Sequence, residues 1–282
     1  MGYKERLKKL TDDLENGIKE VFESEKYKNY LKTMSKFHKY SYNNCMLISM
    51  QKPNATMVAG YNSWKKNFDR YVKKGEKGIK ILAPSPYKTK VKMTKIDPKT
   101  KKPVIKNGKE VTEVQTVQKM GFRTVSVFDI SQTDGKELTR LTSELKGNVK
   151  DFDKFIKSLK DLSPCPIEVK EIKSNAKGYY DRNENKIAIK KGMSELHTIK
   201  TMIHEITHSQ LHSSKEKTYI VEKKSKNTVE VEAESVAFIV SNYYGLDTSD
   251  YSFKYLASWS SDKELTELKK SLKTIRDQSS NM

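Results

Sequence analysis

The segment TMIHEITHSQLH, residues 201–212, places two histidines four positions apart, with a glutamate directly after the first. On a helix with 3.6 residues per turn, His204 and His208 share one face and can reach one ion. Imidazole is a good zinc ligand, and Glu205 is placed to accept a proton from a water molecule at that ion. The segment therefore predicts a zinc centre with a general base. Two surface histidines on a core helix are the alternative.

The same helix has a second, apolar face. Its members follow helical spacing and would anchor the helix in a core: Leu196, Ile199, Ile203 and Ile206. Ser194 is a good N-cap. Four of the five histidines of the chain lie between His197 and His212, which favours a metal site over a chance match. His212 itself lies roughly 12 Å along the axis from His204, too far to share its ion.

A third ligand is expected from a second helix, where the segment EVEAE spans residues 230–234. Glu230 and Glu234 are four positions apart and share a face, whereas Glu232 points roughly the opposite way. We assign Glu230 to the metal. We assign Glu234 to the orientation of a ligating histidine through its free ring nitrogen.

The composition is typical of a soluble protein, with 32% charged and 35% apolar residues among 282. No run of about 18 apolar residues exists, so no membrane span is expected. The first residues lack the apolar core of a secretion signal. Cys45 and Cys165 belong to no paired motif. We expect a cytoplasmic protein with no membrane partner.

Positive charge is concentrated in the first half of the chain. Residues 1–135 hold 29 Lys and Arg against 14 Asp and Glu, a net charge of +15, whereas residues 136–282 hold 26 against 22, a net charge of +4. Such asymmetry indicates that the first half binds an acidic polymer, with nucleic acid as the first candidate. General solubility from a lysine-rich composition is the alternative.

Aromatic and basic residues alternate between residues 61 and 80, where the aromatic ones are Tyr61, Trp64, Phe68 and Tyr71. Single strands are held by stacking bases on aromatic rings while phosphates run past basic side chains. The candidate DNA contacts are Tyr42, Trp64, Lys65, Lys66, Arg70, Lys73, Lys74 and Lys77. Trp64 and Phe68 can instead be core residues, the interpretation we favour for Phe68. We expect single-stranded DNA binding without strong sequence preference.

The chain reads as α+β, with two domains. In the first half, the patterns predict helices over 4–25 and 27–51 (broken near Ser41), a short helix within 54–71, strands over 75–93 and 122–131, and an exposed hairpin or flexible insertion over 95–114. In the second half they predict a helix over 151–162, strands over 167–172 and 185–191, and two long helices, the second ending at Gly245. We place a single-stranded DNA-binding domain at 1–135 with a lysine-rich insertion at about 88–118, a linker at 136–150, and a zincin-like metallopeptidase domain at 151–282.

Two resemblances agree with this division. HEITH followed by EVEAESVAF resembles the ImmA/IrrE-type metallopeptidases, whose pattern is HExxH and then a glutamate three residues before an alanine, here Glu230. The chain departs from that pattern at AES, where those proteins usually have Ala-Asn. Residues 40–84 resemble the single-stranded DNA-binding domain of ArdC-type antirestriction proteins. Those proteins join it to a C-terminal zinc-peptidase-like domain and travel on plasmids and conjugative elements.

The resemblance implies a mobile-element protein that binds single-stranded DNA and protects incoming DNA or counters restriction. It also implies a zinc-dependent metalloendopeptidase with one Zn²⁺ per chain, an unknown protein substrate and Glu205 as the catalytic base. Tyr179, Tyr180, Tyr243 and Tyr244 are candidates for stabilising the oxyanion. Two alternatives stay open: a DNA-binding antirestriction factor with a purely structural zinc, and an ImmA-like protease that cleaves a repressor.

Overall fold

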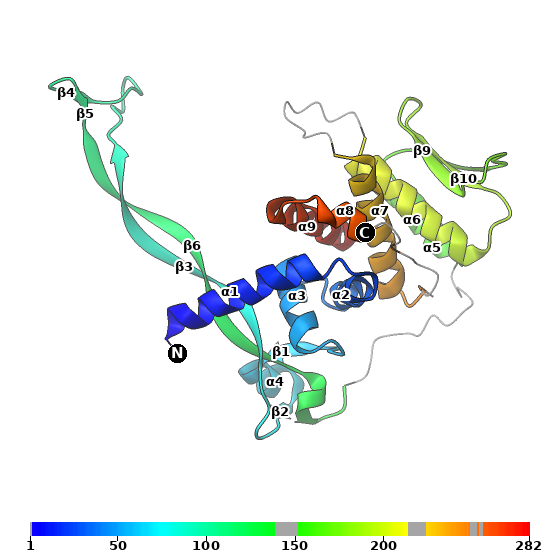
Figure 1. Cartoon of the computed structure of the whole chain (residues 1–282), viewed down its shortest axis with the longest axis horizontal. Coiled ribbons are helices and arrows are strands. Elements are labelled where there is room, and N and C mark those ends of the chain that lie inside the picture. The colour runs from blue at the N-terminus through cyan, green and yellow to red at the C-terminus, as the bar shows by residue number, and fades with distance from the viewer. Residues whose placement is uncertain (1, 139–151, 214–223, 247, 249–252, 254–255) are drawn as a thin grey trace.

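The computed structural model describes residues 2–138, 152–213, 224–246 and 256–282, together with residues 248 and 253. Helices and strands both contribute, and the α+β class expected from the sequence is confirmed (Figure 1). None of the described helices is long and apolar enough to cross a membrane.

Three helices open the chain: α1 (Tyr3–Glu20), α2 (Ser24–Lys36) and α3 (Tyr42–Gln51). The helix expected over 4–25 is confirmed as α1, but it ends at Glu20, and α2 starts after a short turn. The side chain of Ser41 accepts a hydrogen bond from the backbone N–H of Asn44 at 3.3 Å, which caps α3 and confirms the expected break.

A long two-stranded arm follows these helices. β3 (Ile79–Thr94) and β6 (Thr112–Asp129) pair antiparallel along their length, and Figure 1 shows them leaving the body of the molecule. At the base, Ile79, Ile81 and Val127 are buried in the core. Most side chains farther out along the ribbon are exposed.

The outer end of the arm is a small hairpin of β4 (Ile105–Lys106) and β5 (Lys109–Glu110). Asn107 and Gly108 join the two strands with φ angles of 54° and 72°, and two positive values in succession are what a type I′ turn requires. The hairpin expected over 95–114 is therefore confirmed. It is the end of a longer hairpin that starts at β3.

A compact substructure surrounds the base of the arm. It comprises β1 (Val58–Gly60), α4 (Tyr61–Phe68), β2 (Arg70–Val72), the 3₁₀ turn η1 (Ile130–Gln132) and β7 (Thr133–Gly135). β1 pairs with the end of β6, and β2 pairs with β7. The expected basic and aromatic segment therefore folds against the foot of the ribbon.

The second half begins with α5 (Phe152–Leu162) and a three-stranded sheet of β8 (Ile167–Lys170), β9 (Gly178–Asp181) and β10 (Lys186–Lys190). The strand order is β8-β10-β9, with β8 parallel and β9 antiparallel to β10. β9 was not expected as a strand. An added Cβ at Gly178 would lie 2.6 Å from Cγ2 of Thr201, so glycine is needed for β9 to approach the next helix.

That helix is α6 (Glu195–Leu211), and α7 (Lys226–Tyr243) packs beside it. The hydroxyl of Ser194 accepts a hydrogen bond from the backbone N–H of His197, as the N-cap prediction requires. The expected apolar face is confirmed: Ile199, Ile203 and Ile206 are buried, and Leu196 packs against the core. Gly245, with φ 72°, follows the end of α7 as expected.

Two further helices, α8 (Leu256–Ser261) and α9 (Leu265–Asn281), complete the described chain. α9 packs on α7 and also reaches the N-terminal helices. The guanidinium of Arg276 donates to the carbonyl oxygens of Tyr40 at 3.0 Å and His38 at 3.3 Å. The last helix thus ties both halves of the chain together.

The two halves share one core. α2 packs on α7, and the hydroxyls of Tyr27 and Ser235, both buried, are 2.8 Å apart at that contact. Buried side chains from both halves form one continuous cluster. The division into 1–135, 136–150 and 151–282 stays a prediction, and only the first three residues of the expected linker are among the described ones.

Candidate metal centre and nucleic-acid interface

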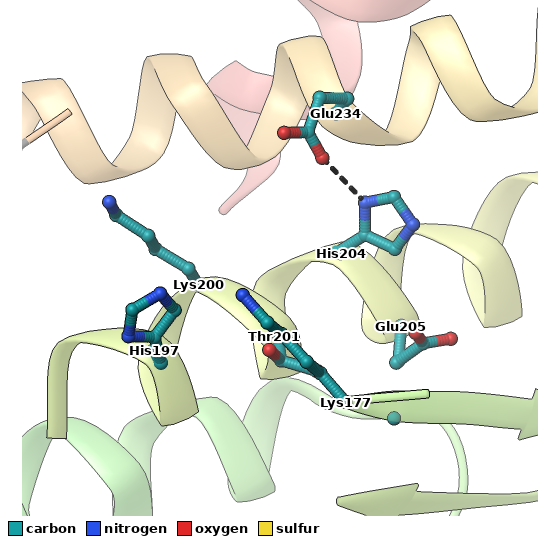
Figure 2. A pocket seen from close by; sticks show the side chains of 8 residues that line it. Lys177, His197, Lys200, Thr201, His204, Glu205 and Glu234 are labelled. Carbon is teal, nitrogen blue, oxygen red and sulfur yellow. Dashed lines mark ion pairs between the residues drawn. The ribbon is translucent and has the colours of Figure 1, made fainter. Parts of the chain in front are cut away.

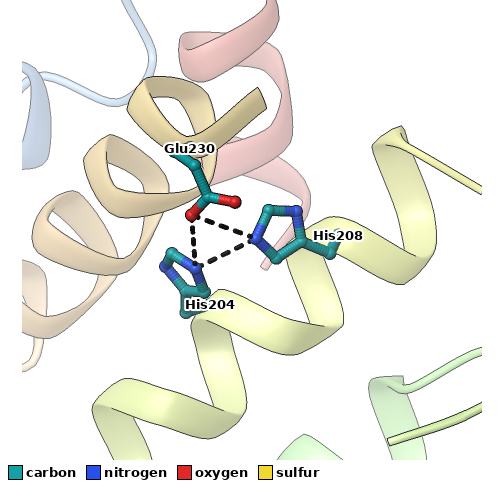
Figure 3. Close-up of side chains that lie close together, drawn as sticks. All are labelled: His204, His208 and Glu230. Carbon is teal, nitrogen blue, oxygen red and sulfur yellow. Dashed lines mark hydrogen bonds and ion pairs between the residues drawn. The ribbon is translucent and has the colours of Figure 1, made fainter. Parts of the chain in front are cut away.

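His204, His208 and Glu230 converge on one point between α6 and α7 (Figure 3). The Nε2 atoms of the two histidines are 3.0 Å apart. Oε2 of Glu230 lies 3.5 Å from Nε2 of His204 and 3.7 Å from Nε2 of His208. The structure therefore brings together the three residues that the sequence assigned to a metal.

The spacing of these atoms fits a small cation. Ligand atoms at about 2.0–2.1 Å from a tetrahedral zinc ion are separated from each other by roughly 3.3 Å. The three observed separations, 3.0, 3.5 and 3.7 Å, lie around that value. Two imidazoles and one carboxylate form a usual zinc donor set. The residues present fit the ion.

Charge around the site also favours a cation. Oε2 of Glu234 lies 3.2 Å from Nδ1 of His204, the ring nitrogen that faces away from the ligand cluster (Figure 2). Burial lowers the pKa of His204, but hydrogen bonds to Glu230 and Glu234 outweigh burial and bring the pKa to about 10. The two imidazoles hold the pKa of Glu230 well below its usual range. The carboxylates thus stabilise positive charge at the centre.

His208 has a comparable support that the sequence reasoning missed. Its Nδ1 lies 3.1 Å from Nδ1 of His212, and Nε2 of His212 lies 3.1 Å from Oε2 of Glu232. Glu232 is fully buried and accepts hydrogen bonds from Nζ of Lys224 at 2.7 and 2.9 Å. His212 lies outside the cluster of His204, His208 and Glu230. The spacing of His212 one turn after His208 was the available signal for this contact.

Glu205 lies on the wall of a cavity of about 260 Å³ that also reaches His204 and Glu234 (Figure 2). Burial raises the pKa of Glu205, while the charges of His204 and His208 act against that rise. The backbone N–H of Tyr180 in β9 also contacts this carboxylate and lowers the pKa. A carboxylate with a raised pKa, beside ligand histidines and an open space, is suited to act as a general base.

The rest of the cavity wall comes from α6 and the start of β9: Lys177, Gly178, His197, Lys200 and Thr201. The four tyrosines proposed for the oxyanion are not among these lining residues. Tyr180 donates its hydroxyl to Asn185 at 2.9 Å, and Tyr243 and Tyr244 pack against other rings. Within the part of the chain that the structure describes, this cavity identifies no tyrosine for that role.

The candidate DNA contacts divide into two groups. Five lysines are exposed around α4 and the turn that leads to β3: Lys65, Lys66, Lys73, Lys74 and Lys77. Tyr42 is partly buried and packs against the core. Two tyrosines of the same segment are more exposed, Tyr61 at 60% and Tyr71 at 54%. Nζ of Lys65 lies 6.0 Å from the ring centroid of Tyr71, which places a basic and an aromatic group side by side.

One of the predicted contacts, Trp64, is wrong, and another, Arg70, is engaged within the fold and stays a prediction. Trp64 is completely buried, and its indole N–H donates to the carbonyl of Phe128 at 2.8 Å, so its ring has no face to offer a base. The guanidinium of Arg70 donates to Thr133, Gly135 and Lys136, joining β2 to β7. Both residues hold the substructure together, a role that depends on tertiary contacts.

Comparison with known proteins identifies a family match in the first half of the chain. Residues 2–128 match the family described as the N-terminal domain of anti-restriction factor ArdC. Residues 2–128 are therefore similar to that domain. The match ends one residue before the end of β6, so it includes the arm and most of the expected DNA-binding region.

The chain is also similar to an uncharacterized protein of Bacillus anthracis, with 28% identity over 98% of this chain. It spans about half the length of that relative, 50%. Two crystal structures of the antirestriction protein ArdC from plasmid R388 also align. The metal-free form has 21% identity, 85% coverage of both chains and a TM-score of 0.46. The Mn(II)-bound form has 19% identity, 84% coverage of both chains and a TM-score of 0.44.

Proposed function

We propose that the chain is an ArdC-type antirestriction protein that binds single-stranded DNA and carries a zinc-dependent metallopeptidase centre. The match of residues 2–128 to the ArdC N-terminal domain supports the antirestriction part. The observation that carries the catalytic part is the convergence of His204, His208 and Glu230 next to a cavity bordered by Glu205.

The number of ligands distinguishes a catalytic from a structural zinc. Structural sites are closed by four protein ligands, whereas catalytic sites have three and keep one position for water or substrate. The cluster found among the described residues has three, and a cavity adjoins it. This supports a peptidase over a DNA-binding factor with a purely structural zinc.

A bound Zn²⁺ supplies a Lewis acid and lowers the pKa of a coordinated water to about 7. The residues of the chain contribute the rest. Glu205 accepts the proton of the attacking water at its carboxylate, and its raised pKa brings it closer to the working pH. Glu234 keeps Nδ1 of His204 engaged, so that Nε2 points to the ligand cluster.

The edge of the small sheet offers a place for a peptide. β9 is an outer strand in the order β8-β10-β9, and Gly178 at its start borders the cavity. An extended peptide that pairs with an exposed edge strand is held by main-chain hydrogen bonds. We propose that the substrate is an extended or unfolded segment of protein, laid along β9 beside Glu205.

Exposed lysines and tyrosines support the DNA-binding part. Lysine side chains around α4 neutralise phosphates, and the rings of Tyr61 and Tyr71 are accessible for stacking. Both interactions are independent of sequence. We infer that the protein protects incoming DNA of a mobile element by covering single strands, with or without cleavage of a protein on that DNA.

The deciding experiment compares wild type with Glu205→Gln in the full-length chain. Metal content, affinity for single-stranded DNA, proteolysis in a cell extract with single-stranded DNA, and protection of transferred DNA in cells are measured for both. We expect the variant to keep zinc and DNA binding and to lose proteolysis. Loss of zinc to the same extent as in His208→Ala would contradict the role given to Glu205. Metal analysis measures both zinc and manganese.

The same comparison separates the alternatives. If Glu205→Gln protects transferred DNA as well as wild type, protection depends on DNA binding alone. If protection falls while zinc and DNA binding are unchanged, cleavage is part of the antirestriction mechanism. A repressor as the only cleaved protein would favour the ImmA-like alternative over ours.

A further inference from the structure

The arm of β3 and β6 has two chemically different faces. Successive side chains of a strand point to opposite faces, and directly paired residues lie on the same face. Lys90 pairs with Thr116 and Lys92 with Val114, so both lysines lie on one side of the ribbon. We call this side, formed by the even-numbered residues 80–94 and 112–126, the lysine face.

Charge is unequal on the two faces. The lysine face carries Lys80, Lys88, Lys90 and Lys92 and no acidic residue, which gives a net charge of +4. The opposite face carries Lys119, Arg123 and Glu113, which gives +2 − 1 = +1. Lysines at alternate positions in β3 produce this difference, because each lies on the same side. A ribbon that needed charge only for solubility has no reason to place it on one face.

Exposed apolar side chains lie on both faces, with Tyr87 and Met93 opposite the lysines and Phe122 and Met120 on the lysine face. Phe122 pairs with Pro84 and Met120 with Pro86, and Phe122 is 51% and Met120 63% exposed. Next to lysines, Phe122 and Met120 supply the apolar contact that unpaired bases require.

The lysine face continues into the body of the protein. At the base of the arm, Lys80 lines a hollow of about 530 Å³ together with Arg6 and Lys9 of α1. Lys80 also lines a second hollow of about 750 Å³, which includes Lys52 and Lys77. Basic side chains therefore extend from Lys77, one of the proposed DNA contacts, to the outer part of the arm.

Acidic residues line the base of this path, and Glu110 lies at its outer end, where its carboxylate accepts a hydrogen bond from the hydroxyl of Thr94. Asp13 and Glu20 of α1 line the first hollow, and Glu76 lines the second. The carboxylate of Glu76 accepts a hydrogen bond from Gln132 at 2.7 Å. The lysine face itself therefore provides most of the net positive charge along the path.

We propose that the lysine face of the arm is a second DNA-binding site, which holds the phosphates of a single strand bound at Lys65–Lys77. This inference rests on the proposed binding of single-stranded DNA. Sixteen paired residues at about 3.3 Å each extend the contact by roughly 50 Å. A single strand is the occupant, because its unpaired bases can contact Phe122 and Met120, whereas a duplex hides the faces of its bases.

The test uses the full-length protein and fluorescence anisotropy with thymidine oligonucleotides of about 8 and about 40 residues, the first within the usual size of one binding site of about 4–16 nucleotides and the second well above it. The double variant Lys90→Glu/Lys92→Glu is compared with Lys119→Glu/Arg123→Glu, which changes net charge equally on the opposite face of the same ribbon. Circular dichroism checks that both variants fold. Phe122→Ser tests the apolar contact separately.

We expect Lys90→Glu/Lys92→Glu to lose at least tenfold in affinity for the long strand and less than twofold for the short one. The slope of log affinity against log salt should fall by about 1.4, which corresponds to two phosphate contacts at about 0.7 each. The opposite-face control should lose less than threefold. Phe122→Ser should lower the affinity for the long strand about fivefold or more, as expected for a lost stacking contact.

Failure of this inference is distinguishable from failure of the proposed function. If wild type binds both strands and the double variants on the two faces of the arm have equal affinities, the proposed second site does not exist and the proposed DNA-binding function stands. If wild type binds neither strand, the proposed function itself is wrong. If the lysine-face variant loses duplex affinity more than single-strand affinity, the choice of a single strand is overturned.

Discussion

Nδ1 of His208 lies 3.1 Å from Nδ1 of His212, and the far nitrogen of His212 contacts the buried carboxylate of Glu232. One ring nitrogen of a ligating histidine faces the metal, and its partner at the other nitrogen fixes the ring orientation and the tautomer. His212 and Glu232 give His208 such a partner. Glu234 does the same for His204.

The first prediction follows from this contact. His212→Ala should lower the affinity for zinc about 10–100-fold while leaving the three ligands in place. The measurement is competition with a chromophoric chelator at fixed pH. His197→Ala is the matched control, because His197 lies on the same helix and at the same cavity but outside the ligand cluster. Equal effects of the two substitutions would contradict a supporting role for His212.

Metal should stabilise the fold. A ligand that binds only the native state adds about 4 kcal/mol to the free energy of unfolding at 1,000 times its Kd. We expect chelation to lower the melting temperature of wild type measurably, and to have almost no effect on Glu230→Ala, which has lost a ligand. Differential scanning calorimetry with and without chelator measures both. Glu264→Ala, at an exposed helix end, is the control that should respond like wild type.

Trp64 should matter for stability. Its buried indole fills space between α4 and the base of the arm and donates to Phe128. Trp64→Ala should lower the free energy of unfolding by about 3–5 kcal/mol, as for other large buried aromatic residues. Urea denaturation measures this free energy.

Tyr71→Ala should change the free energy of unfolding by less than about 0.5 kcal/mol and weaken single-strand binding, because Tyr71 is 54% exposed.

Asp129 should make the fold sensitive to acid. Burial raises the pKa of this carboxyl, but hydrogen bonds from the backbone N–H groups of Thr56, Met57 and Ser131 outweigh burial and lower the pKa. In the unfolded chain, the pKa of an aspartic acid side chain is about 3.9. The stabilisation is therefore complete above pH 4 to 5 and disappears as pH falls through the lower, folded pKa.

Replacing Asp129 by Asn should cost about 1–3 kcal/mol at neutral pH. The difference from wild type should shrink as pH falls below about 4, where the wild-type carboxyl is also becoming neutral. Urea denaturation at several pH values tests this. Asp12→Asn, on the exposed side of α1, is the control and should show no such convergence. A constant difference between wild type and Asp129→Asn at every pH would contradict the prediction.

The metal centre was largely predictable from the sequence, because its geometry follows from two helices. Residues four apart on a helix share a face whatever the rest of the fold does. That rule was sufficient for His204 with His208 and for Glu230 with Glu234. The partnership of His212 with Glu232 was not predictable, because it depends on how α6 and α7 pack, which turns a carboxylate on the other side of α7 toward the end of α6.

The DNA-binding surface was less predictable for the same physical reason. Trp64 and Tyr71 are both aromatic and both lie among lysines, and only tertiary packing buries one and exposes the other. β9 was missed because its strand character comes from pairing with β10 and from the approach of α6 at Gly178. The faces of the arm depend on register, which the separate strand segments do not define.

The shared core has a consequence for how such proteins can be recombined. Tyr27 of α2 meets Ser235 of α7, five residues beyond the glutamate ligand on that helix. An exchange of the first half between relatives would place a foreign α2 against α7, and a poor fit there would shift the helix that carries Glu230. The two halves are therefore not interchangeable cassettes. A successful chimera has to bring the matching surface of α7 with it.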